Sequence, residues 1–232
     1  MTNNKTIEIV PAIMPEDFSA LLDLIEIAGE FSGFVNIDIM DGYFVPTKSW
    51  PYTKENAVEE VYLRHLPSEP RVGVHIMANS PQEIGVACVG AGADRIIFHI
   101  ETLRGEKEAR ECVEALRRAG AEDIGVTLLL ETPLEKIGYL LHEELVDFVQ
   151  VMSIGEIGYQ GHALENMAYD RIKELREAYP EIVIAVDGGV NEHTIAPLVQ
   201  SGANRVYVGS AIMNDPDPKV AYRRLCDLAE SI

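Results

Sequence analysis

Eight short apolar runs, each rich in Val and Ile, alternate along the whole chain with longer amphipathic stretches. Strands that are buried on both faces have this composition, because helices cover the two sides of a parallel sheet. The alternation therefore predicts a series of strand–helix units. We expect the strands over residues 7–13, 33–40, 71–77, 95–101, 123–129, 148–154, 182–189 and 205–212.

The stretches between these runs carry helix start and stop signals. Thr132 followed by Pro133 is typical of a helix N-cap with proline at the first helical position. Gly120 and Gly202 follow amphipathic stretches, where a helix commonly ends in a left-handed residue. We expect helices over residues 16–29, 55–65, 81–90, 106–119, 134–143, 164–179, 192–201 and 218–230.

The number and spacing of the units predict the fold. Eight consecutive strand–helix units fill 232 residues, and no Pro- or Ser-rich linker or change of composition divides them. This pattern favours one (β/α)8 barrel, a TIM barrel, as a single domain over residues 1–232. A doubly wound open sheet is the rival arrangement.

Charge and composition exclude several classes of partner. The formal net charge of −19 argues against nucleic acid or an anionic membrane surface as a partner. No apolar run is long enough to span a membrane, and the first residues lack the apolar region of a signal peptide. Cys88, Cys112 and Cys226 are far apart in sequence, as expected of reduced thiols in a cytoplasmic protein.

Polar residues interrupt three of the predicted strands near their carboxyl ends, where barrels of this kind carry their chemistry. Asp38, His75 and Asp187 lie on three different strands and could converge on one divalent cation. A set of hydrogen-bonded polar residues that lines a pocket is the alternative reading. Alternation along the strand places Asn36, Asp38 and Met40 on one face. Two carboxylates on opposite sides of a substrate can also remove and return a proton.

Glycine-rich turns follow the last three predicted strands. They contain Gly161, Gly188 with Gly189, and Gly209 with Ser210. Turns after the seventh and eighth strands of a barrel commonly bind phosphate through backbone N–H groups. Such a site would let an acidic protein bind an anionic substrate without lysine or arginine.

These motifs closely resemble those of the ribulose-phosphate 3-epimerase family. The resemblance rests on NIDIMDGYFVP at 36–46, VHIM at 74–77, FHIE at 98–101, VDGG at 186–189 and VGSAI at 208–212. It implies a (β/α)8 enzyme of the pentose phosphate pathway, an isomerase that interconverts D-ribulose 5-phosphate and D-xylulose 5-phosphate by proton transfer at C3. It also implies a homo-oligomer.

The resemblance also implies roles for individual residues. Asp38 and Asp187 would be the acid/base pair and metal ligands, with His75 as a third ligand and Asn36 at the position of a fourth. On the chemistry of the residues themselves, two carboxylates and an imidazole suit Zn²⁺, Mn²⁺, Fe²⁺ or Co²⁺. His99 with Glu101 could orient His75 or the ligand set, or form a structural hydrogen bond at the barrel mouth. The implied substrate and phosphate contacts are Met40, Met77, Met152, Gly161, Gly188, Gly189, Gly209 and Ser210.

Several positions depart from the family pattern. Asn36 stands where the family usually has a metal-binding histidine, and Pro15 stands where it usually has a serine that contacts substrate. The segments around Trp50 and Tyr159 also differ. Two alternatives therefore stay open: a 3-epimerase of another ketose phosphate, such as allulose 6-phosphate, and a non-catalytic phosphosugar-binding protein. A decarboxylase or aldol-type synthase is disfavoured, because 38–41 reads DIMD without a lysine.

Overall fold

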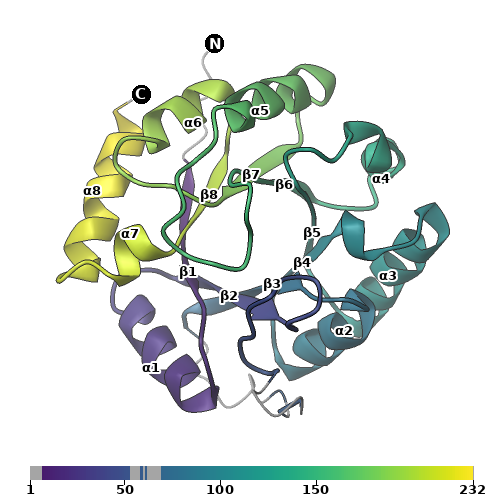
Figure 1. Ribbon diagram of the computed structural model, residues 1–232, viewed down its shortest axis with the longest axis horizontal. Helices are drawn as coiled ribbons and strands as arrows, with labels where there is room; N and C mark the ends of the chain where they lie inside the picture. The colour runs from purple at the N-terminus through teal and green to yellow at the C-terminus, as the bar shows by residue number, and fades with distance from the viewer. Residues whose placement is uncertain (1–6, 53–57, 60, 62–68, 232) are drawn as a thin grey trace.

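The computed structural model describes residues 7–52, 58, 59, 61 and 69–231. Eight parallel strands form a closed barrel in chain order, and β1 pairs with both β2 and β8. Figure 1 shows the strands as a ring with the helices outside it. The strands are β1 (Glu8–Ile13), β2 (Phe34–Met40), β3 (Arg71–Met77), β4 (Arg95–His99), β5 (Asp123–Leu128), β6 (Phe148–Met152), β7 (Val183–Asp187) and β8 (Arg205–Val208). The (β/α)8 barrel expected from the sequence is confirmed.

The helices follow the strands as expected, and the predicted ends of α3 and α8 match the structure. The single helix expected over 134–143 with Thr132 as its N-cap is wrong, because this segment forms a 3₁₀ turn over Leu134–Lys136 and a separate helix over Gly138–His142. The described helices are α1 (Phe18–Gly29), α2 (Pro81–Ala91), α3 (Glu106–Ala119), α4 (Gly138–His142), α5 (Met167–Ala178), α6 (Ile195–Ser201), α7 (Ser210–Met213) and α8 (Pro218–Glu230), with 3₁₀ turns η2 (Ile100–Thr102) and η3 (Leu134–Lys136). The helix expected over 55–65 falls largely outside the described residues. None of the helices described is long and apolar enough to cross a membrane.

Five expected strands end earlier than their apolar runs, since those over 123–129, 148–154 and 182–189 stop at Leu128, Met152 and Asp187. The other two show why. The run at 205–212 leaves the sheet after Val208, because Gly209 breaks the extended conformation and Ser210 begins α7. The run at 95–101 ends at His99, and Glu101 lies in η2. There the Thr102 hydroxyl donates to the His99 carbonyl at 2.8 Å and closes the turn. Both corrections move polar residues from a strand into the loops at the barrel mouth.

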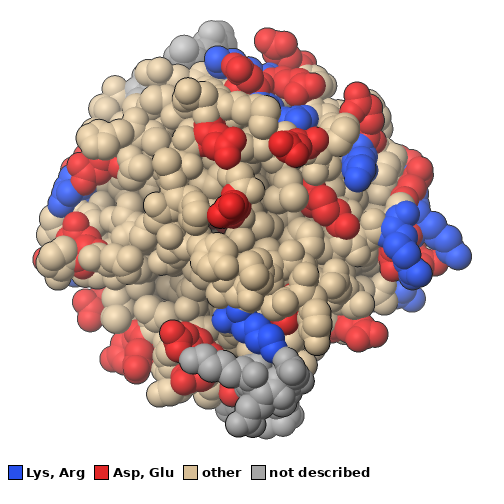
Figure 2. Space-filling view, in the orientation of Figure 1, with Lys and Arg blue, Asp and Glu red and all other residues tan. Residues whose placement is uncertain are grey.

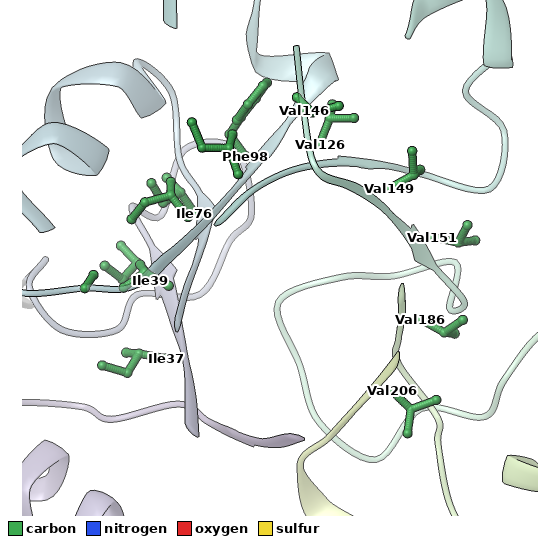
Figure 3. Close-up of a cluster of buried hydrophobic side chains, with 14 of the residues drawn as sticks. Ile37, Ile39, Ile76, Phe98, Val126, Val146, Val149, Val151, Val186 and Val206 are labelled. Atoms are coloured by element: carbon green, nitrogen blue, oxygen red, sulfur yellow. The ribbon is translucent and has the colours of Figure 1, made fainter. Parts of the chain in front are cut away.

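Alternation along the strands divides the buried residues into two layers. The outer layer fills the space between the barrel and the helices, and Figure 3 shows Ile37, Ile76, Val151 and Val206 pointing away from the barrel axis. The inner layer includes Val10, Ala12, Ile97, Phe148, Ala185 and Tyr207. Asp38 has the same parity as Phe34 in β2, so its side chain lies on the inner face.

Paired charges close the end of the barrel where the strands begin. Arg95 Nε lies 2.6 Å from Asp123 Oδ2, and Arg205 Nε lies 2.5 Å from Glu8 Oε2. The Arg95 guanidinium also stacks over the Phe34 ring at 4.2 Å. Both arginines are buried, with 5% and 8% of their surface exposed. This packed base leaves the opposite end of the barrel for chemistry.

Candidate active site

Asp38, His75 and Asp187 meet inside the barrel at its carboxyl end. Their ligand atoms all lie within 4.8 Å of one another. His75 Nδ1 is 3.1 Å from Asp187 Oδ2 and 3.5 Å from Asp38 Oδ1. The strands place them there because Asp38 and His75 are register partners on β2 and β3, and Asp187 ends β7. The convergence predicted from the sequence is present.

Burial and mutual charge shift the protonation of this group. Burial raises the pKa of Asp38 to about 6; the hydrogen bond with His75 opposes this shift, and the nearby Asp187 charge adds to it. Burial alone would lower the pKa of His75, but hydrogen bonds to Asp187 and Asp38 outweigh it and raise the pKa to about 9. A proton is therefore held between Asp38 and His75 near neutral pH.

Asn36 lies directly below Asp38 on the inner face of β2. Its amide Nδ2 donates to Asp38 Oδ1 at 3.0 Å. Its amide oxygen is buried and has no hydrogen-bond partner among the residues that the structure describes. Gly73 on β3 makes room for it, since a Cβ at Gly73 would come within 2.9 Å of Asn36 Oδ1. Asn36 therefore contacts the carboxylate of Asp38 through its N–H group. A role for its oxygen as a metal ligand stays a prediction.

A chain of hydrogen bonds leads away from His75 on the side opposite the carboxylates. His75 Nε2 lies 3.1 Å from His99 Nε2, and His99 Nδ1 lies 3.2 Å from Glu101 Oε2. Both imidazoles are fully buried and their rings stack. Burial lowers the pKa of His99 to about 4 despite Glu101. Burial favours the neutral form of Glu101, but the contacts with His99, Thr132 and the Leu129 N–H together outweigh it and lower the carboxyl pKa.

Sequence reasoning missed Gln150. It lies on the inner face of β6, and its amide Nε2 is 3.3 Å from His75 Nε2 and 3.4 Å from Asp187 Oδ2. Gln150 is fully buried. The available signal was its position two residues before Met152 in an otherwise apolar run, which gives it the parity of an inner-face residue.

A cavity of about 220 Å³ opens above the carboxylates. Asp38 and Asp187 reach it, as do seven of the eight predicted substrate and phosphate residues, which are Met77, Met152, Gly161, Gly188, Gly189, Gly209 and Ser210. Met40 is the exception. It is fully buried against Val45 and Met77 and lines a neighbouring cavity with Met14, Thr47, Lys48, Ser49 and Tyr52. Tyr159, Asn191 and Tyr207 line the main cavity as well.

The turn after β7 needs glycine at both positions. Gly188 and Gly189 have φ values of 110° and 64°, and a Cβ at Gly189 would lie 2.5 Å from the Leu164 backbone nitrogen. The Ser153 hydroxyl donates to the Gly188 carbonyl at 2.5 Å, and Asn191 donates to the Gly189 carbonyl at 3.0 Å. The two carbonyl oxygens are thus bonded within the protein, which suits a turn that meets an anion.

Comparison of the sequence with known proteins shows the family of this chain. The sequence pattern of the ribulose-phosphate 3-epimerase family matches residues 8–213. The chain belongs to this family. The family expected from the sequence motifs is therefore confirmed, and so, at the level of the family, is a sugar-phosphate epimerase as the class of enzyme.

Curated members of the ribulose-phosphate 3-epimerase family are similar over most of their length. The cytoplasmic isoform of ribulose-phosphate 3-epimerase from Oryza sativa subsp. japonica is 29% identical, with 91% of this chain and 89% of that protein covered. The enzyme of that name from Bacillus subtilis is 29% identical, with 93% and 96% covered. At this level of identity the chain is a divergent member of the family.

Solved structures with the same fold include enzymes of other names. Orotidine 5'-phosphate decarboxylase from Pyrococcus horikoshii aligns with a TM-score of 0.67 at 19% identity, covering 97% of this chain and 100% of that one. The 3-hexulose-6-phosphate synthase from Salmonella typhimurium aligns with a TM-score of 0.68 at 16% identity, covering 97% and 99%. These similarities show the shared fold.

Proposed function

We propose that this chain is a ribulose-phosphate 3-epimerase that interconverts D-ribulose 5-phosphate and D-xylulose 5-phosphate. The observation that carries the proposal is the pair of carboxylates, Asp38 and Asp187, at the floor of a cavity whose rim is built from glycine-rich turns. Membership of the ribulose-phosphate 3-epimerase family supports it.

In the proposed reaction, one carboxylate takes the C3 proton from one face of the substrate, and the other carboxylate returns a proton to the opposite face. Such a pair needs one protonated and one ionised member at the working pH. The raised pKa of Asp38, about 6, brings it close to that requirement. The Asp187 side chain is 14% exposed and faces the same cavity. Epimerisation is complete when the two have exchanged roles.

The donor set fits a divalent cation. Two carboxylate oxygens and one imidazole nitrogen, all nearly buried and within 4.8 Å of one another, suit Zn²⁺, Mn²⁺, Fe²⁺ or Co²⁺. Asp38, His75 and Asp187 would hold the ion, and the unpartnered amide oxygen of Asn36 is a further oxygen donor close by. A cation there would stabilise the negative charge that develops on the substrate oxygens when the C3 proton leaves.

The phosphate would bind at the turns after β6, β7 and β8. Gly161, Gly189 and Ser210 line the cavity there, and no lysine or arginine is among the described residues that line it. Backbone N–H groups can hold a phosphate without such cations. Met77 and Met152 supply apolar walls nearer the carboxylates.

One observation favours a larger ketose phosphate as a second candidate. Met14 lines both the main cavity and the neighbouring cavity that contains Met40, Lys48 and Tyr52. The two spaces therefore share a wall, and a small movement of Met14 would lengthen the site. A six-carbon substrate such as D-allulose 6-phosphate could use that length.

Proton NMR in D₂O tests these proposals. We expect the metal-stripped protein, reconstituted with each of the four cations in turn, to exchange the C3 proton of ribulose 5-phosphate and to form xylulose 5-phosphate. Asp38→Asn and Asp187→Asn should each lower turnover by about 10²–10⁴-fold, while Asp23→Asn on the exposed face of α1 should not. Faster exchange with allulose 6-phosphate would favour the second candidate, and binding without exchange of either sugar would indicate a non-catalytic protein.

A further inference from the structure

The hydrogen-bond chain behind His75 has a direction that can be traced from its far end. Glu101 Oε1 accepts from the backbone N–H of Leu129 at 3.0 Å and from the Thr132 hydroxyl. A backbone N–H can only donate, so this oxygen is fixed as an acceptor. The second oxygen, Oε2, is thereby turned toward His99 Nδ1, 3.2 Å away.

An ionised carboxylate has no proton to offer. The Leu129 N–H and the Thr132 hydroxyl both donate to Glu101 and stabilise its ionised form, so His99 Nδ1 must carry the hydrogen that joins the imidazole to the carboxylate. His99 is fully buried beside a second imidazole, a setting that disfavours a second proton on its ring. A neutral His99 with its proton on Nδ1 has a bare Nε2.

The bare nitrogen of His99 faces His75. The two Nε2 atoms are 3.1 Å apart, and a hydrogen bond between them requires the proton to sit on His75 Nε2. When His75 is neutral, its Nδ1 then keeps a lone pair, and Nδ1 is the atom that points to Asp187 and Asp38. Gln150 lies at similar distances from both nitrogens of His75, 3.4 and 3.3 Å, so it does not reverse this assignment.

We propose that Glu101 and His99 are positioning residues that hold the His75 proton on Nε2 and so leave Nδ1 free to bind the cation. This inference rests on the cation site of the proposed function. It explains why Nδ1 of His75, and not Nε2, would bind the cation. Imidazole ligands usually donate their other N–H to a carboxylate or carbonyl. Here a second imidazole stands between the ligand and the carboxylate.

The substitution Glu101→Gln tests the direction of the chain with almost no change of shape. The N–H of Leu129 requires an acceptor, so the amide oxygen of Gln should take the place of Oε1 and turn its NH₂ group toward His99 Nδ1. Every bond in the chain then reverses. His99 carries its proton on Nε2, His75 carries its proton on Nδ1, and the lone pair no longer faces the carboxylates.

Two readouts follow this reversal in the purified protein. ¹⁵N NMR of the metal-free proteins is recorded at about pH 10, where His75 is neutral because its pKa is about 9. It should show His99 protonated at Nδ1 in the wild type and at Nε2 in Glu101→Gln. Titration with Zn²⁺ against a competing chelator should show that Glu101→Gln binds Zn²⁺ about 10- to 100-fold more weakly than the wild type. Glu108→Gln removes one partly exposed charge on α3, a carboxylate paired with Arg104 and outside the chain from Glu101 to His75, and should change neither readout. Thr132→Val removes one donor to Glu101 but keeps the carboxylate, so His99 should stay protonated at Nδ1.

A wild-type His99 that carries its proton on Nε2 would overturn the proposal, and this measurement needs no variant to fold. A loss of Zn²⁺ affinity in Glu101→Gln without movement of the proton would also overturn it, because charge alone would then explain the loss. The proton position is read without substrate or metal. Absence of epimerase activity would thus count against the proposed function and leave the assignment of His99 intact.

Discussion

Asn36 occupies the position at which the resemblance of the motifs predicts a metal-binding histidine. In place of an imidazole it offers an amide, whose N–H group supports Asp38 and whose oxygen has no partner. An amide oxygen is a weaker ligand than imidazole for Zn²⁺ or Fe²⁺. Among the described residues, the proposed cation site therefore has one imidazole ligand, His75, and we expect the binding of the cation to depend heavily on it.

We expect Asn36→His to tighten Zn²⁺ binding by about tenfold or more, because it adds a second nitrogen ligand. Gly73 leaves room beside this position. The measurement is the Zn²⁺ affinity of the metal-stripped variant, determined by competition with a chelator and compared with that of the wild type. Equal affinity in the two proteins would mean that position 36 does not contact the ion.

His75 should make the stability of the metal-free protein depend on pH. Its pKa is raised from 6.5 to about 9, so the stabilisation that it provides is fully present below pH 6.5 and is lost as pH rises through 9. This rise in pKa corresponds to at most about 3 kcal/mol in the free energy of unfolding. Urea unfolding with a chelator present should give a lower free energy of unfolding at pH 9.5 than at pH 6.5. The same fall should persist in His142→Asn, which alters an exposed histidine, and a free energy that stays level would contradict the prediction.

The site residues that sequence reasoning found share one property, which is that each interrupts an apolar strand at its carboxyl end. Asp38, His75 and Asp187 could be placed together because parallel strands of a barrel end at one mouth. Gln150 was missed because an amide in an apolar run gives a weaker signal than a charged group. The direction of the contacts, such as the amide N–H of Asn36 toward Asp38, depends on side-chain torsions that no spacing encodes.

At the scale of elements, periodicity identified the barrel strands but not all of their ends. Val208 and His99 end their strands although apolar residues continue beyond them. In the first case Gly209 interrupts the extended backbone, and in the second a 3₁₀ turn is closed by the Thr102 hydroxyl. Hydrophobic pattern reports burial, and both of these loop segments contain buried residues, so pattern alone cannot separate them from strand.

The inner layer of the barrel is so tightly packed that a single methyl group should be felt. A Cβ at Gly125 on β5 would lie within 2.2–2.7 Å of the Phe148 ring from β6. We expect Gly125→Ala to lower the free energy of unfolding by about 1–3 kcal/mol through overpacking. Gly90 near the end of α2 is the matched control, since a Cβ there meets nothing within 4 Å. Gly90→Ala should be neutral or stabilising by up to about 1 kcal/mol. Equal effects of the two substitutions in urea unfolding would refute the argument.

At the scale of the molecule, the charge of −19 acts on any anionic substrate before it reaches the cavity. Acidic side chains are spread over the face shown in Figure 2, and no described residue that lines the main cavity is a lysine or arginine. Long-range repulsion of this kind is screened by salt.

If the proposed function holds, kcat/KM for ribulose 5-phosphate should rise by a factor of about 2 to 10 when ionic strength increases from 10 to 150 mM. The expected direction is opposite to that of an enzyme that attracts its substrate with surface cations. KCl and sodium acetate at equal ionic strength should give the same rise, which separates screening from binding of a particular ion. A fall in kcat/KM would show that local positive charge dominates.

One end of the barrel is closed by the ion pairs of Arg95 and Arg205 with Glu8 and Asp123, and the Tyr207 ring lies above them. The cavity therefore opens at the other end of the barrel, its mouth. A small molecule that enters at the mouth has to leave by the same route. Substrate and product therefore pass through the same opening, and one molecule must leave the cavity before the next can bind. If the proposed function holds, product competes with substrate for this mouth, so the balance of the two sugars outside the protein governs how fast either one is turned over.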